Sequence, residues 1–163
     1  AVISDLAGEG VRRIVRLGTC VARVDDLKPG SVVLVESVLG MDGVSNRMGA
    51  SGEILPDAGL TDLLDGLGRS GMISSHDLLA RNDRMGPTSD EGVGPDRPVL
   101  ARDLQTAATF AVAADLSIAA AALLIVSEDR KGERLEEAEL EPEFLDLGRL
   151  VLDRIAPAER LFN

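Results

Sequence analysis

The sequence predicts an α/β domain with a mostly parallel, mixed central sheet and helices on both faces. The main observation is residues 103–128, DLQTAATFAVAADLSIAAAALLIVSE, where helix formers pass directly into an unbroken apolar run. That run, residues 118–126, is too short to cross a bilayer and reads as a central strand covered on both faces. A second observation is that strand patterns alternate with helical patterns along the chain, which is typical of a parallel sheet.

Composition restricts the class of protein. The 163 residues suffice for one domain, 1–163, and 45% of them are apolar, enough for a core. A net charge of −11 argues against nucleic acid and anionic membranes as partners, because both require a basic surface. The single cysteine, Cys20, cannot form an internal disulfide, and the sequence shows no leader pattern or membrane-length apolar run. A cytoplasmic protein with small-molecule or protein partners is expected.

The first half of the chain contains two clear strand patterns. A short helix over Val2–Gly8 precedes a strand over residues 11–17, which Gly18-Thr19-Cys20 is expected to end. Residues 25–30, DDLKPG, form a turn before a second strand over residues 31–39. Residues 40–56 are rich in Gly, Ser and Asn and predict a long loop of the kind that carries function.

Two further helices are predicted along the chain. Leucines at helical spacing predict a surface helix, and a weak strand over residues 72–75 leads to His76 and Asp77. Residues 81–98 predict a mobile loop, and residues 129–143 a charged, solvated segment. A last helix is expected to end at Pro157. The apolar stripes of these two helices are Leu60, Leu63, Leu64 and Leu67, then Phe144, Leu147, Val151, Leu152 and Ile155.

Three motifs in this order and spacing resemble the superfamily of nucleoside phosphorylases and nucleosidases. They are IVRLGTC from Ile14, DLKPGSVVLVESVLGMDG from Asp26, and the long stretch at residues 103–128. The resemblance implies an enzyme of the pentosyltransferase class that cleaves the N-glycosidic bond of a nucleoside or nucleotide. It implies phosphate as a co-substrate in phosphorylases, water as the nucleophile in nucleosidases, no other cofactor and no metal.

The resemblance assigns a phosphate site to Arg16 and Thr19. A guanidinium can hold two phosphate oxygens at once, and the amides of an expected turn at Gly18-Thr19 would add donors. The alternative for Arg16 is an ion pair with a surface acid.

The ribose site falls on Leu104 and Gln105. In the family pattern of acid, methionine, acid, the second acid holds the 2′ and 3′ hydroxyls and the methionine packs on the sugar. Gln105 replaces that acid, and an amide accepts with one end and donates with the other, which alters the clamp. The alternative is that Gln105 caps or lines the start of the helix.

The catalytic acid falls on Glu128, which stands where the family has an aspartate that protonates the leaving base. The extra methylene displaces the carboxyl group unless the site has shifted to match. Asp129 is a second candidate, and capping of the next segment is the alternative role. The base-binding segment contains His76, Asp77 and Leu79, with an aliphatic pair in place of the family's stacking aromatic pair.

Two departures from the family bear on activity. Val21 stands where glycine is usual. Family members also carry an additional N-terminal portion, with the first strands and a phosphate-binding loop, before the part that this chain resembles. Three explanations stay open: a fragment of a longer protein, strands supplied by another chain, or a decayed subunit. A homo- or hetero-oligomer is expected, because an open sheet edge needs cover. The alternative function is a non-catalytic subunit or binding domain that completes or regulates an active paralogue.

Overall fold

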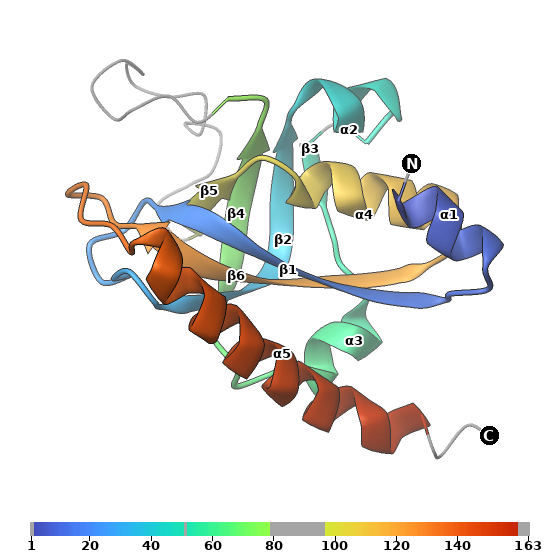
Figure 1. Ribbon diagram of the computed structural model, residues 1–163. Coiled ribbons are helices and arrows are strands. Elements are labelled where there is room, and N and C mark those ends of the chain that lie inside the picture. Colours follow the sequence, from blue (N-terminus) through green and yellow to red (C-terminus); the bar gives the residue numbers. More distant parts are fainter. Residues whose placement is uncertain (1, 51, 79–96, 160–163) are drawn as a thin grey trace.

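The computed structural model describes residues 2–50, 52–78 and 97–159. Residues 81–96 of the expected mobile loop lie outside the described residues, as does Leu79. The described chain contains five helices and six strands (Figure 1). They are α1 (Val2–Gly8), β1 (Arg13–Ala22), β2 (Val32–Met41), α2 (Gly43–Arg47), β3 (Gly52–Ile54), α3 (Ala58–Leu63), β4 (Arg69–His76), β5 (Val99–Asp103), α4 (Thr106–Asp115), β6 (Ala119–Glu128) and α5 (Glu137–Glu159).

The strands form one mixed sheet in the order β3-β2-β4-β5-β1-β6. Three pairs are parallel (β1 with β6, β2 with β4, β4 with β5) and three are antiparallel (β1 with β5, β2 with β3, β2 with β6). The α/β class with a mixed sheet is confirmed. Parallel pairs also account for most of the paired residues, although β1 and β2 each have an antiparallel neighbour as well.

The sheet closes on itself. The start of β2 pairs with the middle of β6, with Val32 opposite Ile125 and Leu34 opposite Leu123. The ring therefore runs β6-β1-β5-β4-β2 and returns to β6, a barrel-like arrangement rather than the expected open sheet. β6 is nevertheless buried along most of its length, as its apolar run predicts.

Helices cover two faces of the sheet (Figure 1). On one face, α4 packs through Ala107, Phe110 and Ala113 on a core that includes Ala122 and Val126 of β6. On the other face, α3 and α5 pack on Leu123 and Ile125. Alternate residues of β6 thus serve different cores, because successive side chains of a strand point to opposite faces.

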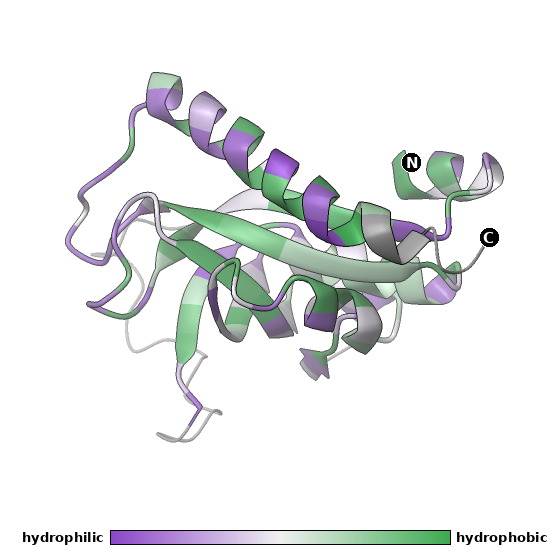
Figure 2. Cartoon of the chain, turned by 90° about the horizontal axis from the view of Figure 1, so that it is seen from below, coloured by the Kyte–Doolittle hydropathy of each residue, from purple (hydrophilic) through white to green (hydrophobic). Residues whose placement is uncertain are grey.

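The last helix differs from its predicted limits. α5 begins at Glu137, inside the segment expected to be solvated, and continues past Pro157 to Glu159. Its stripe packs as expected through Phe144, Leu147 and Val151, but Leu152 is 66% exposed. Figure 2 shows the alternation of hydrophobic and hydrophilic residues along α5 above strongly hydrophobic strands.

Other segments also differ from the prediction. β1 runs through Gly18-Thr19-Cys20 to Ala22, so those residues are strand and not turn. The expected loop at residues 40–56 contains the end of β2, then α2, whose N-cap is Asp42, and β3. β5, which follows the loop-like segment, was not predicted.

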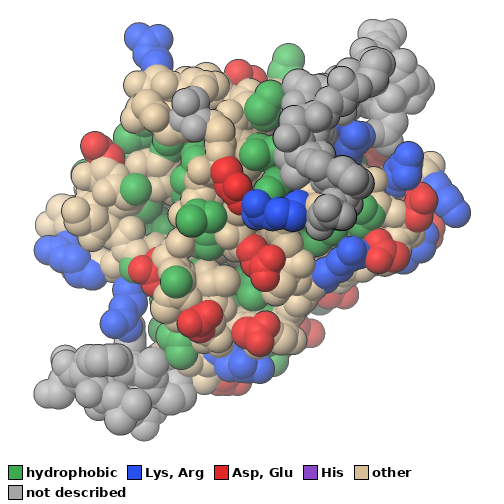
Figure 3. Space-filling model, turned by 180° about the vertical axis from the view of Figure 1, so that it is seen from behind, with side chains coloured by type: hydrophobic (Ala, Val, Ile, Leu, Met, Phe, Trp, Pro, Cys, Tyr) green, Lys and Arg blue, Asp and Glu red, His purple; other side chains and the backbone are tan. Residues whose placement is uncertain are grey.

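The surface is mixed in charge. On the face shown in Figure 3, acidic and basic side chains are scattered among apolar ones.

Among the described residues, no helix is both long enough and apolar enough to span a membrane.

Candidate functional site

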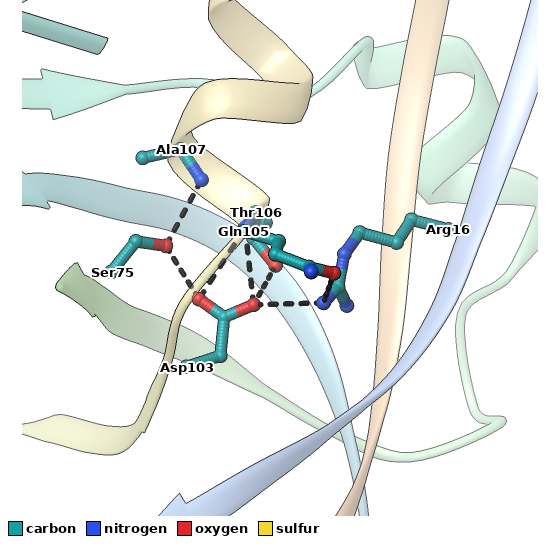
Figure 4. Close-up of polar contacts among 6 residues, drawn as sticks. All are labelled: Arg16, Ser75, Asp103, Gln105, Thr106 and Ala107. Carbon is teal, nitrogen blue, oxygen red and sulfur yellow. Dashed lines mark hydrogen bonds and ion pairs between the residues drawn. The ribbon is translucent and has the colours of Figure 1, made fainter. Parts of the chain in front are cut away.

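Arg16 projects from the middle of β1 on the face that α4 covers. It lies opposite Ala122 of β6, a member of the core under α4. Its Nη2 atom is 3.3 Å from Oδ2 of Asp103 and donates a hydrogen bond to Oε1 of Gln105 at 3.2 Å (Figure 4). The structure therefore brings together two of the predicted site residues, Arg16 and Gln105, through an acid to which the sequence analysis gave no role.

Asp103 is the last residue of β5 and is 1% exposed. Its carboxylate accepts hydrogen bonds from Ser75 Oγ, from the backbone N–H of Thr106 at 3.0 Å and from Thr106 Oγ1 at 2.6 Å. Ser75 Oγ in turn accepts from the N–H of Ala107 at 3.0 Å, so the network joins β4, β5 and the start of α4 (Figure 4). A buried carboxylate with this many donors is held in one position.

The charge of Arg16 is partly removed from water. Its side chain is 14% exposed. Burial lowers the pKa of the Arg16 guanidinium, and the nearby Asp103 carboxylate opposes that shift. An arginine stays protonated under these conditions. Its second terminal nitrogen, Nη1, is fully buried and has no hydrogen-bond partner among the described residues.

Gln105 occupies the N-cap position of α4, but its side chain makes no capping hydrogen bond. The acceptor at the start of this helix is instead Asp103, three residues before the first helical residue, Thr106. Gln105 therefore lies at the start of the helix, as its alternative role predicts, but without a capping hydrogen bond from its side chain. Leu104, the predicted sugar-packing residue, is 42% exposed beside it.

Thr19 faces away from Arg16. It lies opposite Ile125 of β6, which belongs to the core under α3 and α5, whereas Arg16 lies opposite Ala122 in the core under α4. Because Gly18 and Thr19 are inside β1, the turn whose amides were expected to donate to phosphate is absent at this position. The expected turn at Gly18-Thr19, which would have placed Arg16 and Thr19 on one phosphate, is therefore corrected: both residues belong to the longer strand.

Glu128 lies at the end of β6, opposite Val21 of the parallel neighbour β1. The Arg16 guanidinium extends over Gly18 towards the same end, so the two side chains do not point to opposite ends of the sheet. The Glu128 carboxylate is 18% exposed and forms an ion pair with Arg134 at 2.5 Å.

The neighbouring Asp129 has a different role. It is 1% exposed, accepts from the N–H groups of Lys131 and Glu133, and lies 3.4 Å from Lys28 Nζ. Burial alone would raise the pKa of Asp129, but these hydrogen bonds and Lys28 lower it on balance. A carboxylate so held supports the turn after β6 and is poorly suited to donate a proton.

The base-binding candidates lie at the ends of β4 and β2. His76 is 7% exposed, with Nε2 2.9 Å from Ser74 Oγ, and it lies opposite Met41. Asp77 accepts from the N–H of Gly43 at 3.2 Å and so fastens the end of β4 to α2. Strand β4 is parallel to both β2 and β5, so these residues lie with Asp103 at the carboxyl ends of the strands. Ligands collect at such strand ends in α/β proteins.

A pocket of about 450 Å³ lies elsewhere, at the other end of α4, lined by Arg12, Phe110, Ser117 and their neighbours. None of the predicted site residues lines it.

The chain is similar to purine nucleoside phosphorylase DeoD-type 2 of Aliivibrio fischeri. The two are 29% identical over 168 residues, a stretch that covers 91% of this chain and 65% of the relative. The resemblance to nucleoside phosphorylases is confirmed. The chain thus spans about two thirds of the length of that relative. No protein-family model matches it.

Asp103 is the residue that reasoning from the nucleoside phosphorylase resemblance missed. The signal was an acid three residues before Thr106, at the point where a strand passes into an Ala-rich helix. Asp at such a position accepts from the first free N–H groups of a helix. That pattern would have located the acid but not its contact with Arg16, 87 residues earlier in the chain.

Proposed function

We propose that this chain carries a nucleoside phosphorylase-type pentosyltransferase site, with the fold of that superfamily, which cleaves the N-glycosidic bond of a nucleoside or nucleotide. The observation that carries the proposal is the contact of Arg16 with Gln105 at the sheet edge, in a chain similar to a purine nucleoside phosphorylase. The resemblance assigned these two residues to phosphate and ribose, and their contact supports adjacent subsites for the two groups.

In the proposed reaction an oxygen of phosphate attacks the anomeric carbon of the sugar while the bond from that carbon to the base nitrogen breaks. The base leaves with the bonding electrons and takes up a proton. Arg16 holds the phosphate, Gln105 contacts a ribose hydroxyl, and Glu128 supplies the proton once its carboxyl group is protonated and released from Arg134.

Two features support a slow enzyme. An amide at Gln105 in place of a carboxylate gives up charge-assisted hydrogen bonds worth about 1.5–3 kcal/mol, or one to two decades in rate if felt in the transition state. The Glu128 carboxylate is engaged by Arg134, and that ion pair must break before Glu128 can reach a leaving base.

These same features favour the second candidate, a non-catalytic subunit that completes or regulates an active paralogue. Its site would bind a nucleoside or phosphate without turnover. The two candidates differ in whether the purified chain releases a free base.

The test is base release from adenosine, inosine, uridine and AMP, with and without phosphate, by the purified chain. We expect phosphate-dependent release slower than about one per second, abolished in Arg16→Ala and reduced in Glu128→Gln. Release that is equal with and without phosphate would indicate hydrolysis instead. Binding of a nucleoside without any release would support the non-catalytic subunit. Release that Arg16→Ala leaves unchanged would contradict the assigned site.

A further inference from the structure

The pocket at the end of α4 is separate from the candidate site. It lies at the amino ends of the parallel strands β1 and β6, where α1 leads into β1 (Figure 1), whereas Arg16 and Asp103 meet beside the start of α4. The ten residues of α4, about 15 Å of helix, separate the two places. The pocket volume of about 450 Å³ lies within the usual range for a small-molecule site, about 300–1,000 Å³.

Backbone hydrogen bonds hold the walls of this pocket in place. Residues 118–120, at the junction of α4 and β6, bond to the end of α4, to the segment before β1 and to the segment before α3. The three bonds are Ile118 N–H to the Ala113 carbonyl at 2.8 Å, Ala119 N–H to the Arg12 carbonyl at 3.0 Å, and Asp57 N–H to the Ala120 carbonyl at 2.7 Å. Because each wall is fixed to the same stretch of chain, the pocket is formed before any ligand binds, which lowers the cost of binding.

The pocket combines a buried apolar floor with an exposed cationic rim. Phe110, Ala113 and Ile118 line the floor, and each is at most 5% exposed. Arg12 and Arg13 line the rim and are exposed. An anion is attracted to such a rim even in a chain of net charge −11, because nearby charges act more strongly than distant, screened ones.

The guanidinium of Arg12 is not paired with an acid within the described residues. Its Nη1 atom donates to the carbonyl oxygens of Ala7 at 3.4 Å and Val11 at 3.1 Å, which are neutral acceptors. Asp57, the acid among the lining residues, is engaged elsewhere, because its carboxylate accepts from the N–H of Leu60 at the start of α3. The end of α1 therefore holds the positive charge of Arg12 at the mouth of the pocket, where a ligand can reach it.

We propose that this pocket binds a small amphipathic anion. The apolar body of the ligand lies on the floor around Phe110, and its oxyanion, a carboxylate or a phosphate monoester, lies against Arg12 and Arg13. A guanidinium can hold two oxygens of such a group, and each charge-assisted hydrogen bond is roughly twice as strong as a neutral one. The apolar body gains further free energy from contact with the floor. The ligand needs both parts, and its binding does not depend on the proposed reaction.

The probes are octanoate, octyl phosphate, octanamide and acetate, each titrated into the whole chain by calorimetry at fixed ionic strength. We expect octanoate to bind about tenfold or more tightly than octanamide, which lacks the charge, and than acetate, which lacks the apolar body. Octyl phosphate that binds more tightly than octanoate would support a phosphate monoester as the ligand, and the reverse order would support a carboxylate. Equal binding of octanoate and octanamide, or no binding of either octyl anion, would overturn the proposal.

Two variants locate the site. Arg12→Ala should weaken octanoate binding about tenfold. Ala114→Met places a larger side chain in the pocket and should abolish binding; it should fold, because Ala114 is exposed and methionine favours a helix. The matched controls are Arg149→Ala and Ala138→Met, at exposed positions of α5 away from the pocket, and both should bind octanoate as the wild type does. Wild-type affinity in either Arg12→Ala or Ala114→Met would overturn the proposal.

Nuclear magnetic resonance shows where the anion binds. Octanoate should shift the backbone amide signals of residues 117–120 and of Asp57, and it should leave those of Asp103 and Gln105 in place. Shifts that centre on Asp103 and Gln105 would put octanoate at the candidate site and overturn this inference. The base-release assay of the proposed function is independent of this result, so the two can fail separately.

Discussion

The guanidinium of Arg16 lies against the backbone of Gly18, two residues along the same strand, so closely that a Cβ on residue 18 would collide with Nη1. Gly18 is therefore the space in which the Arg16 side chain rests. The contact explains why a glycine stands inside a strand, where it would otherwise weaken the sheet.

Gly18→Ala should displace Arg16 from Asp103 and Gln105. The atoms in the way are the end of a flexible side chain, so we expect a modest loss of about 1–3 kcal/mol in the free energy of unfolding. Phosphate binding should fall by tenfold or more, since a displaced guanidinium no longer presents its donors (about 1.5–3 kcal/mol per charged hydrogen bond). Chemical denaturation and phosphate titration of the same protein measure the two effects.

The control for this prediction is Gly59→Ala in α3. A Cβ at Gly59 meets an ordinary contact with Asp57 at 3.4 Å, and alanine favours a helix. The control should keep or raise stability and leave phosphate binding unchanged. A Gly18→Ala protein that binds phosphate normally would show that the position of Arg16 does not matter to the anion.

Asp129 should make stability depend on acid pH. The pKa of Asp129 is lowered in the folded chain, so the folded chain binds this proton less readily than the unfolded chain does. The Asp129 carboxylate therefore stabilises the fold at pH values above its unfolded-state pKa of about 3.9. The contribution is lost as pH falls from there through the folded pKa. Asp129→Asn should therefore be less stable than wild type at pH 7, with a difference that shrinks below about pH 4.

Urea denaturation of both proteins from pH 7 to pH 3 measures this difference. The matched control is Asp146→Asn, because Asp146 pairs with Arg149 on α5 with its side chain 72% exposed. Exposed pairs contribute little, about 0–1 kcal/mol. A pH-independent gap between wild type and Asp129→Asn would mean that the charge of Asp129 is not what stabilises the turn.

The sequence predicted elements whose signal is local. The apolar run of β6 and the leucine spacing of α3 were sufficient, because each buries a continuous face. The end of β1 was misplaced because Gly18 reads as a break, and only the three-dimensional position of Arg16 explains it. Closure of the ring depends on three residue pairs between β2 and β6, and their apolar sequences fit an open sheet equally well.

The site was predictable only in part. The resemblance led to Arg16 and Gln105, and the structure joins them. Asp103 was missed because its contact with Arg16 is non-local. The face on which Thr19 lies depends on strand register, since a shift of one residue in the pairing of β1 moves each side chain to the other face.

Ser117 is the site of a local strain that can be relieved. It has a φ of 56° after α4, where the N–H of Ile118 bonds to the carbonyl of Ala113 at 2.8 Å and that of Ser117 to Ala114 at 3.1 Å. This is the helix end in which glycine is usual. Ser117→Gly removes the cost of holding serine in a left-handed conformation, but it also adds conformational entropy to the unfolded chain. The net effect should be a rise of about 0.5–1 kcal/mol in the free energy of unfolding. Thermal unfolding measures it, and a loss of stability would show that the serine hydroxyl makes a contact of its own.

One side of β1 has few strand partners, which predicts association with a second chain. β1 pairs with β6 over most of its length, but among the described residues it pairs with β5 only at Val21 and Ala22. Residues 14–19 therefore present a strand edge on that side, and such an edge is a template for another strand. We expect sedimentation at micromolar concentration to show a species heavier than one chain. α5 is the competing surface, since Leu145 and Leu152 are 56% and 66% exposed. Leu145→Lys with Leu152→Lys should leave the assembly intact if the β1 edge forms it, and a stable monomer of the wild-type chain would contradict the prediction.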